Sequence, residues 1–320
     1  MRIARLVPTA ALAALLPALF LASAVHAADP NQVPPPPAMA ARAYLLVDHN
    51  SGRTLASLNE NQKLDPASIT KLMTAYAVFR SVKDKRIGLE DPVVISEAAW
   101  RTGVSRSFGD LGDRVPLSVL LKGMIIQSGN DASVALAEHV SGSESAFADL
   151  MNQYAKELGM GSTSYRNATG LPDPEHYTTA TDILTLANAI IREFPDYYRW
   201  YSEKEFTWNG ITQSNRNGLL WRDSTVDGMK TGFTDTAGYC LVSSALRDDM
   251  RLVAVVLGTD SPAARERESQ TLLNYGYRFY ETKQLLTAGK PLSQARVWKG
   301  ENELVDVGVR RNIWVTVPRG

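Results

Sequence analysis

The pattern of apolar and polar positions predicts a hairpin, then a block of helices, then a second group of strands. Residues 42–59 contain two strand-like runs on either side of the turn-rich segment DHNSG, which predicts a β-hairpin. Helical periodicity follows, and strand character returns after it. The predicted helices cover residues 66–79, 115–127, 130–142, 144–160, 179–194 and 269–282, and the later predicted strands cover residues 204–210, 237–246 and 250–259.

This order of elements predicts an antiparallel sheet flanked by helices, with a helical insert between the first hairpin and the later strands. We therefore assign residues 40–281 to one domain of the α+β class. After Glu281, three short strand-like runs predict a small β-rich domain over residues 282–320. About forty residues in three strands is too little for independent stability, so we expect this second domain to be incomplete at Gly320.

Residues 1–27 have the three-part layout of a secretory signal peptide. Arg2 and Arg5 supply the positive start, an apolar run follows, and the small residues before Ala28 offer a cleavage site. A retained membrane anchor fits less well, because two prolines interrupt the apolar run. Residues 28–39 are rich in proline and predict an extended tether. The sequence therefore predicts an exported protein.

The amino-acid composition limits the partners and cofactors that we expect. Of 320 residues, 44% are hydrophobic and 21% are charged, with a formal net charge of zero, so nothing indicates nucleic acid as a partner. Cys240 is the only cysteine, which excludes an internal disulfide, and its strand-like surroundings predict a buried, small apolar side chain. The histidines after the predicted cleavage site, His49, His139 and His176, have no metal-ligand spacing, so we expect no metal and no other cofactor.

The segment DPASITKLM contains Ser68 and Lys71 in an otherwise apolar helical run. Side chains three residues apart share a helix face, so the amine can reach the hydroxyl. Pro66 suits a helix start, which puts Ser68 in the first turn, where free N–H groups and the helix dipole favour an oxyanion. A desolvated lysine can act as the base for a serine. An S-x-x-K pattern also arises by chance, as a serine near an N-cap with a solvated lysine.

Two further polar motifs accompany it. Ser128 and Asn130 lie in a break between two predicted helices, where a hydroxyl and an amide two residues apart can point into one cleft. Lys230, Thr231 and Gly232 precede a predicted strand, where the polar pair suits a carboxylate and the glycine permits close approach of a substrate backbone. Taken singly, the first motif also suits an ordinary turn that ends in an N-cap, and the second suits an exposed hairpin strand.

The order S-x-x-K, S-x-N and K-T-G is the signature set of penicillin-binding proteins and serine β-lactamases, which makes Lys71 the expected activator of Ser68. The wider sequence resembles the low-molecular-mass D-alanyl-D-alanine carboxypeptidases, the group related to penicillin-binding proteins 5 and 6 (peptidase family S11). The resemblance covers nearly all of residues 40–281 and includes LDPASITKLMTAY, KEFTWNGITQSNRNGLLW and ARERESQTLLNYGYRFYET. It implies a penicillin-binding, serine β-lactamase-like fold, with residues 282–320 as the family's stalk domain.

The resemblance implies a role for each motif residue. Ser68 would be the acylating nucleophile and Lys71 its base, while Ser128 would relay protons to the leaving amine. Asn130 would hold the substrate's peptide backbone, and Lys230 would supply a positive field.

The K-T-G motif would complete the implied site. Thr231 would bind the substrate's terminal carboxylate, and Gly232 would let the substrate approach the strand. The backbone N–H groups of Ser68 and Phe233 would form the oxyanion hole, which needs no particular side chain.

Two positions stay open under this resemblance. Arg265 matches a family arginine that also contacts the carboxylate, with Arg267 as a nearby alternative and a plain surface charge as the simpler explanation. Many relatives have histidine after K-T-G, whereas this chain has Phe233. The backbone donor is retained, but any part of an imidazole in substrate fit or pH dependence is lost.

The implied reaction removes the terminal D-alanine of a peptidoglycan pentapeptide, and β-lactam antibiotics would acylate the same serine. A DD-endopeptidase that cleaves peptidoglycan cross-links is the nearest alternative. A class A β-lactamase is disfavoured, because Gly129 stands where those enzymes usually carry aspartate and Glu175 lacks their glutamate-to-asparagine pattern. A Ser-His-Asp hydrolase would need a G-x-S-x-G motif, and a non-catalytic cell-wall binding module would not need an activated serine.

The resemblance also implies a location. A carboxypeptidase of this group would act in the periplasm, at the outer face of the inner membrane. In the family, a C-terminal amphipathic helix after the stalk holds the enzyme peripherally on that membrane. Nothing in residues 282–320 resembles that helix, so we expect the sequence to be truncated there.

Overall fold

The structure, a computed structural model, describes residues 33–103, 105–106 and 109–320. The predicted signal peptide, residues 1–27, lies outside the described residues, as do residues 28–32 of the predicted tether. The described part of the tether has no regular secondary structure. It is attached by a hydrogen bond in which the Tyr275 hydroxyl donates to the Pro34 carbonyl at 2.9 Å.

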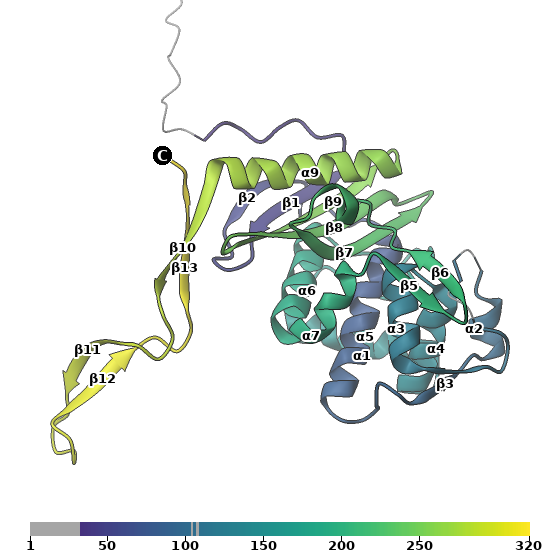
Figure 1. The fold of residues 1–320 in the computed structure, drawn as a ribbon, viewed down its shortest axis with the longest axis horizontal. Coiled ribbons are helices and arrows are strands. Elements are labelled where there is room, and N and C mark those ends of the chain that lie inside the picture. The colour runs from purple at the N-terminus through teal and green to yellow at the C-terminus, as the bar shows by residue number, and fades with distance from the viewer. Residues whose placement is uncertain (1–32, 104, 107–108) are drawn as a thin grey trace, which may run out of the picture. The chain divides into compact units, whose positions relative to one another are not determined.

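An antiparallel sheet of five strands, in the order β2-β1-β9-β8-β7, forms the centre of the fold (Figure 1). The predicted first hairpin is confirmed as β1 and β2, and β1 also pairs with β9, which joins the start of the chain to its later strands. Because β8 and β9 are covered on both faces, the central residues of both strands are buried. The strands are β1 (Ala43–Asp48), β2 (Thr54–Leu58), β7 (Val226–Thr234), β8 (Gly238–Arg247) and β9 (Met250–Thr259).

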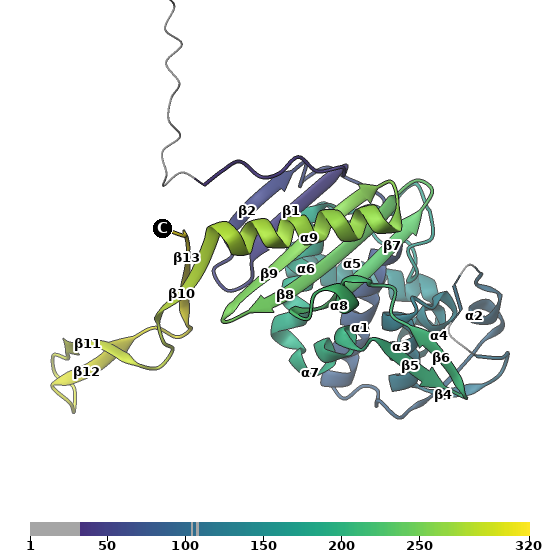
Figure 2. The same cartoon turned by 45° about the horizontal axis from the view of Figure 1, so that its top comes forward.

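Helices pack on both faces of this sheet (Figures 1 and 2). The helix α9 (Pro262–Phe279) lies along one face, and a helical block covers the other. This block is the predicted insert. Its helices are α1 (Lys71–Lys83), α2 (Glu97–Arg101), α3 (Leu117–Ile126), α4 (Asn130–Ser141), α5 (Glu144–Leu158), α6 (Ala180–Glu193) and α7 (Pro195–Tyr198), with the 3₁₀ turns η1 (Ala67–Thr70) and η2 (Arg199–Ser202).

Short elements connect the larger ones, and among their strands the sequence pattern predicted only the one at residues 204–210. Two small hairpins and a four-residue helix are among them, and runs this short carry too few positions to show a period. They are β3 (Pro92–Val94) with β4 (Arg114–Pro116), β5 (Glu205–Trp208, predicted) with β6 (Ile211–Ser214), and α8 (Leu219–Arg222).

The helix α1 runs through the interior of the helical block. Every residue from Lys71 to Phe79 is buried, and Leu72, Met73 and Tyr76 are at most 1% exposed. A helix that is buried on all sides belongs to a core, whereas the sequence predicted one apolar face. The surrounding helices α3, α4, α5 and α6 cause this difference, since all of them contact α1.

The chain after α9 forms a small β-rich part, as predicted. The predicted helix over residues 269–282 begins and ends too late, because α9 already starts at Pro262, and Tyr280 is extended and begins a strand. The residues of β11 and β12 are all exposed, as expected for a unit too small to build a core. The strands are β10 (Tyr280–Leu286) paired with β13 (Ile313–Pro318), and β11 (Pro291–Arg296) paired with β12 (Leu304–Gly308).

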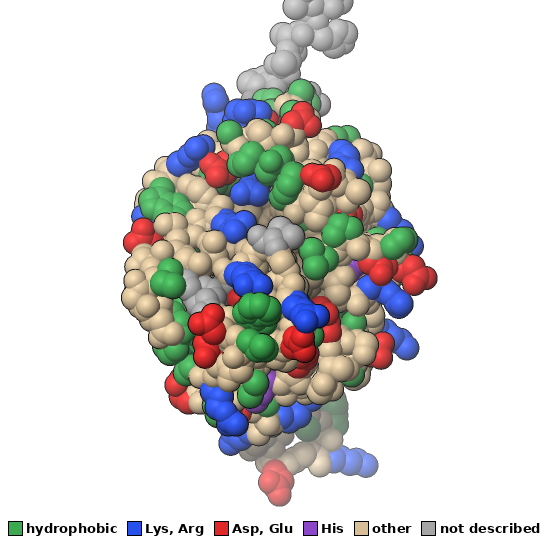
Figure 3. Space-filling model, turned by 90° about the vertical axis from the view of Figure 1, so that its right-hand side faces the viewer, with side chains coloured by type: hydrophobic (Ala, Val, Ile, Leu, Met, Phe, Trp, Pro, Cys, Tyr) green, Lys and Arg blue, Asp and Glu red, His purple; other side chains and the backbone are tan. Residues whose placement is uncertain are grey.

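The surface of the helical side carries mixed charge. Figure 3 shows acidic and basic side chains interspersed on that face. None of the helices within the described ranges has the length and apolar character needed to span a bilayer.

The helix α9 approaches the sheet closely at Gly276. A Cβ there would lie 2.5 Å from Leu252 Cδ1 and 3.0 Å from Leu46 Cδ2, and both leucines are 0% exposed. We predict that Gly276→Val lowers the free energy of unfolding by about 2 kcal/mol, because overpacking a closed core is costly. Urea unfolding measures this. The control Ala263→Val, on the exposed face of the same helix, should change it by less than about 1 kcal/mol, and equal losses would contradict the prediction.

Candidate active site

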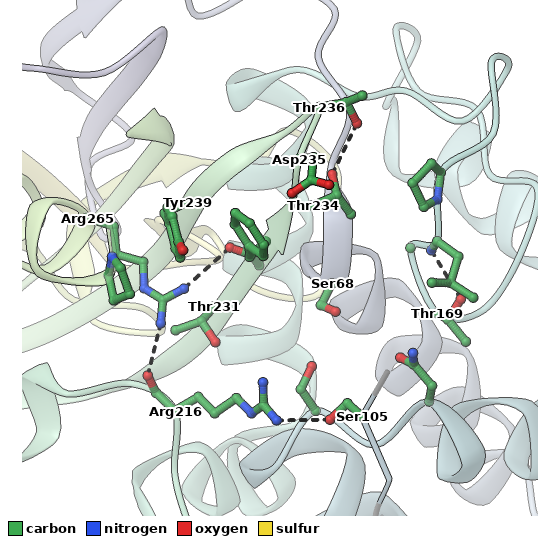
Figure 4. A pocket seen from close by; sticks show the side chains of 18 residues that line it. Ser68, Ser105, Thr169, Arg216, Thr231, Thr234, Asp235, Thr236, Tyr239 and Arg265 are labelled. Atoms are coloured by element: carbon green, nitrogen blue, oxygen red, sulfur yellow. Dashed lines mark hydrogen bonds between the residues drawn. The ribbon is translucent and has the colours of Figure 1, made fainter. Parts of the chain in front are cut away.

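A pocket of about 590 Å³ lies where β7, the start of α9 and the turn η1 meet (Figure 4). Most of the predicted site residues line it. Lys71 and Lys230 lie behind the pocket wall, at 1% and 2% exposure. The predicted residues that line the pocket are Ser68, Ser128, Asn130, Thr231, Gly232, Phe233 and Arg265.

Ser68 lies in the 3₁₀ turn η1, so the prediction that it occupies the first turn of an α-helix is wrong in detail. Ala67 is in the left-handed region at φ +47°, and its N–H donates to the Asp65 carboxylate at 2.9 Å, which fixes a tight turn before α1. A 3₁₀ turn has three residues per turn, so side chains at i and i+3 are aligned. The Lys71 amine therefore donates to Ser68 Oγ at 3.0 Å.

Lys71 is buried and held by three acceptors. Besides Ser68, its amine donates to Asn130 Oδ1 at 2.8 Å and to the Thr169 carbonyl at 2.6 Å. Burial, together with the positive charge of Arg216, lowers the pKa of Lys71 to about 7, while Asp131 and Glu144 act to raise it. The amine is therefore partly neutral at neutral pH, which a solvated lysine is not.

The break between α3 and α4 places Ser128 opposite the K-T-G strand. Ser128 has φ +67°, an unusual left-handed conformation for serine, and its side chain is 4% exposed. The Lys230 amine donates to Ser128 Oγ at 2.9 Å. Burial and the nearby Lys71 hold the pKa of Lys230 well below its ordinary value. The two motif lysines thus face two different serines.

The strand β7 lies directly against η1 at Gly232. A Cβ on this residue would lie 3.2 Å from the Ile69 nitrogen and 3.2 Å from the Pro66 carbonyl oxygen, so a side chain would push strand and turn apart. Beyond it, Phe233 is 46% exposed at the pocket edge and stacks on Tyr239, with ring centroids 4.2 Å apart. The pocket edge is therefore aromatic at this position.

Arg265 and Arg267, the two candidate arginines, lie in different places. Arg265 lines the pocket, is 8% exposed, and donates to the Gly232 carbonyl at 3.4 Å. Its Nε is buried with no hydrogen-bond partner among the described residues. Arg267 is exposed and pairs with Glu268 at 2.7 Å. Of the two candidate arginines, only Arg265 therefore lines the pocket.

Two protein-family models match this chain. The model of the D-alanyl-D-alanine carboxypeptidase family of peptidases matches residues 30–261, and that of the penicillin-binding protein 5 C-terminal domain matches residues 280–320. The chain belongs to the D-alanyl-D-alanine carboxypeptidase family. Among curated relatives of this carboxypeptidase, "D-alanyl-D-alanine carboxypeptidase DacA" of Escherichia coli K12 is 43% identical, over 99% of this chain and 81% of its own.

Solved structures share the fold. Penicillin-binding protein 5 from Haemophilus influenzae aligns with a TM-score of 0.85 at 44% identity, over 89% of this carboxypeptidase and 84% of that chain. Penicillin-binding protein D2 from Listeria monocytogenes, in its ampicillin-bound form, aligns with a TM-score of 0.71 at 27% identity, over 76% of this chain and 100% of that one. The predicted fold class is therefore confirmed.

Sequence reasoning missed two groups in the site of this carboxypeptidase. Arg216 is exposed at the pocket edge, where its guanidinium donates to Ser105 Oγ at 3.1 Å (Figure 4). It stands in one of the family-like stretches, but in no motif. Thr169 contributes through its carbonyl, and a backbone acceptor leaves no signal in the sequence.

The remaining candidate chemistry lies elsewhere. Cys240 is 0% exposed, and burial raises the pKa of its thiol to about 11, as expected for a small core side chain. In the part of the chain that the structure describes, no group of three or more His, Cys, Asp or Glu side chains could hold a metal ion.

Arg216 offers a test of the site's electrostatics. Because its positive charge disfavours the ammonium form of Lys71, we predict that Arg216→Met raises the pKa of Lys71 by about half a unit, solvent screening limiting the effect. NMR titration of protein labelled with ¹³C-lysine measures this pKa. Arg222→Met, at an exposed arginine paired with Glu266, is the control and should leave it unchanged. A fall in the Arg216 variant would contradict the prediction.

Proposed function

We propose that the chain is a serine-type D-alanyl-D-alanine carboxypeptidase that removes the terminal D-alanine of peptidoglycan pentapeptides through an acyl-enzyme on Ser68. The observation that carries this proposal is the 3.0 Å contact between the Lys71 amine and the Ser68 hydroxyl. A serine needs a base to attack a carbonyl, and a buried lysine with a pKa of about 7 can serve as that base.

In the acylation step, Ser68 Oγ attacks the carbonyl carbon of the penultimate D-alanine while the neutral Lys71 amine takes the hydroxyl proton. The backbone N–H groups of Ser68 and Phe233 donate to the developing oxyanion. The close approach of β7 to η1 at Gly232 supports this pairing, because it keeps the two backbone segments adjacent. Asn130 is the candidate for holding the substrate's peptide backbone.

The leaving group needs a proton. When the bond between carbonyl carbon and amide nitrogen breaks, Ser128 passes a proton to the departing amine of D-alanine. The 2.9 Å contact from Lys230 to Ser128 Oγ supports this relay, since the lysine can orient and resupply the hydroxyl. Water then attacks the ester carbonyl, and the proton that it loses passes through Ser128 back to Lys230. The bond between the carbonyl carbon and Ser68 Oγ breaks as Lys71 returns its proton to that oxygen, and the shortened peptide leaves.

Recognition of the substrate's terminal carboxylate is assigned to Thr231 and Arg265. The buried, unpartnered Nε of Arg265 supports this assignment, because a buried guanidinium donor is costly without an acceptor. Lys230 and Arg216 add positive charge around the same pocket. A carboxylate at this place therefore enters a cationic environment.

β-Lactam antibiotics are proposed to acylate the same serine, as the ampicillin-bound form of the Listeria relative suggests by analogy. Rapid hydrolysis of that acyl-enzyme is not expected. Glu175, the acid considered for a β-lactamase-like role, is exposed, is absent from the pocket lining and pairs with Arg166 at 3.6 Å. The acyl-enzyme should therefore accumulate.

The proposal also covers the division of the chain into domains and its location in the cell. We assign catalysis to residues 40–281 and the stalk to residues 282–320, which the separate matches of two family models support. The signal-peptide layout of residues 1–27 supports export to the periplasm, at the outer face of the inner membrane.

Ser68→Ala is predicted to abolish the reaction. Incubation with a pentapeptide that ends in D-alanyl-D-alanine should release free D-alanine from the wild type and at least about 10³-fold less from the variant, because no acyl-enzyme can form. The control Ser57→Ala, at an exposed serine of β2, should match the wild type. Equal release by the Ser68 variant would overturn its assignment. If the wild type released none, a cross-linked dimer substrate would separate an endopeptidase from a silent binder.

Phe233 is predicted to give substrate an apolar contact in place of an imidazole. Phe233→His should add a titration limb near pH 6–7 to the profile of kcat/KM, because imidazole titrates in that range. Phe233→Leu keeps an apolar side chain and should retain the shape of the wild-type profile. Identical profiles for wild type and Phe233→His would contradict a role for this position.

A further inference from the structure

One segment of the pocket wall that belongs to none of the three sequence motifs packs against η1. Residues 166–176, named here the clamp segment, supply Thr169 and Gly170 to the pocket. Gly170 has φ +82°, and a Cβ on it would collide with the Ala67 carbonyl. The clamp segment therefore touches the Ser68 turn backbone to backbone, a contact that only glycine permits.

The clamp segment contacts α1 through its own carbonyls. Thr169 O accepts from the Lys71 amine at 2.6 Å, and Ala168 O accepts from Thr74 Oγ1 at 2.7 Å. Both are main-chain groups, so their positions depend on how the backbone of the segment is held. Because the segment packs directly over η1, it also helps to keep water away from the Lys71 amine.

The C-terminal end of the clamp segment is attached by His176, which is 4% exposed. Its Nδ1 accepts from the Arg166 backbone N–H at 3.3 Å, so the neutral ring carries its proton on Nε2. Nε2 in turn lies 2.9 Å from Thr70 Oγ1 and donates to it. Thr70 directly precedes Lys71, so one ring joins both arms of the clamp segment to the catalytic turn.

We propose that His176 is a positioning residue, whose neutral ring holds the clamp segment against Thr70 and so keeps the Thr169 carbonyl on the Lys71 amine. This inference rests on the proposed role of Lys71 as the base for Ser68. His176 itself touches neither the substrate nor the reacting atoms. It acts through the position of a backbone carbonyl and through the cover over the amine.

The charged groups around His176 are consistent with a neutral ring that positions the clamp segment. Burial lowers the pKa of His176 to about 4, while Asp65 and Asp173 act to raise it and Arg166 to lower it. The ring therefore stays neutral over the working pH range, and its Nδ1 stays an acceptor.

The charged groups around Lys71 are Arg216, Lys230, Asp131 and Glu144, and burial is the largest influence on its pKa. Loosening the clamp segment would admit water to the amine. The pKa of Lys71 should then rise toward that of a solvated lysine, even though the Thr169 carbonyl, which favours the charged form, is lost.

A pair of substitutions separates positioning from simple stability. His176→Leu removes both ring hydrogen bonds, whereas His176→Gln places an acceptor and a donor at similar positions without a titratable ring. For each variant, NMR of ¹³C-lysine-labelled protein measures the pKa of Lys71 without turnover. Acylation by a fluorescent penicillin measures the rate across pH. His139→Leu, at a partly exposed histidine on α4, is the matched control.

We expect His176→Leu to acylate at least about tenfold more slowly at pH 7 and to raise the pKa of Lys71 by half a unit or more. His176→Gln should restore both values to near those of the wild type. An unchanged Lys71 pKa in the leucine variant, with normal acylation by the wild type, would overturn the inference. Absence of acylation in the wild type would instead contradict the proposed function.

Thr70→Val provides a second route if His176→Leu fails to fold. This substitution keeps the shape of the side chain and removes the hydroxyl that accepts from the ring. It should shift the Lys71 pKa in the same direction. A wild-type pKa in this variant would show that the link through Thr70 does not hold the clamp segment.

Discussion

The structure depends on the burial of one lysine. Removing an ammonium from water is expensive, and at 1% exposure Lys71 cannot escape to solvent. Three oxygens, from Ser68, Asn130 and Thr169, accept hydrogen bonds from its amine, while the fold lowers its pKa to about 7. The same burial that costs stability produces an amine that can be neutral beside a serine hydroxyl. The burial of this one side chain therefore affects both the stability of the fold and the reactivity proposed for the site.

That burial needs several segments to meet closely. Gly232 lets β7 lie against η1, and Gly170 lets the clamp segment lie against Ala67. At both places a β-carbon would separate backbones that enclose the amine. The left-handed conformations of Ala67 and Ser128 are further local strain at the pocket. The sheet and the helical block hold this strain in place, because both are closely packed around it.

A second feature is the excess of positive charge on one side of the pocket. Lys230 and Arg265 are buried there, and Arg216 stands at the edge. Arg216 and Arg265 both lower the pKa of Lys230, and Arg216 also lowers that of Arg265, so the group is poorly compensated without a ligand. An anionic substrate terminus would relieve that repulsion. The proposed carboxylate recognition thus draws on the same positive charges that add to the effect of burial on the pKa of Lys71 and Lys230.

By itself, the sequence determined the motif residues and the order of the main elements. Ser68, Lys71 and the K-T-G motif could be found because their side-chain chemistry and spacing are visible in neighbouring positions of the sequence. The signal was weaker where an element is short or where a helix passes into a strand, as at Tyr280.

Only the tertiary structure decided how those residues act together. The 3₁₀ geometry at Ser68, the choice of Arg265 over Arg267, and the carbonyl of Thr169 on Lys71 depend on contacts between distant segments. The histidines show no regular spacing in the sequence, so nothing there marked His176. Folding places its ring against Thr70. Neither a backbone hydrogen-bond acceptor nor the burial of a side chain can be read from the identity of a residue. They exist only once the chain has closed around them.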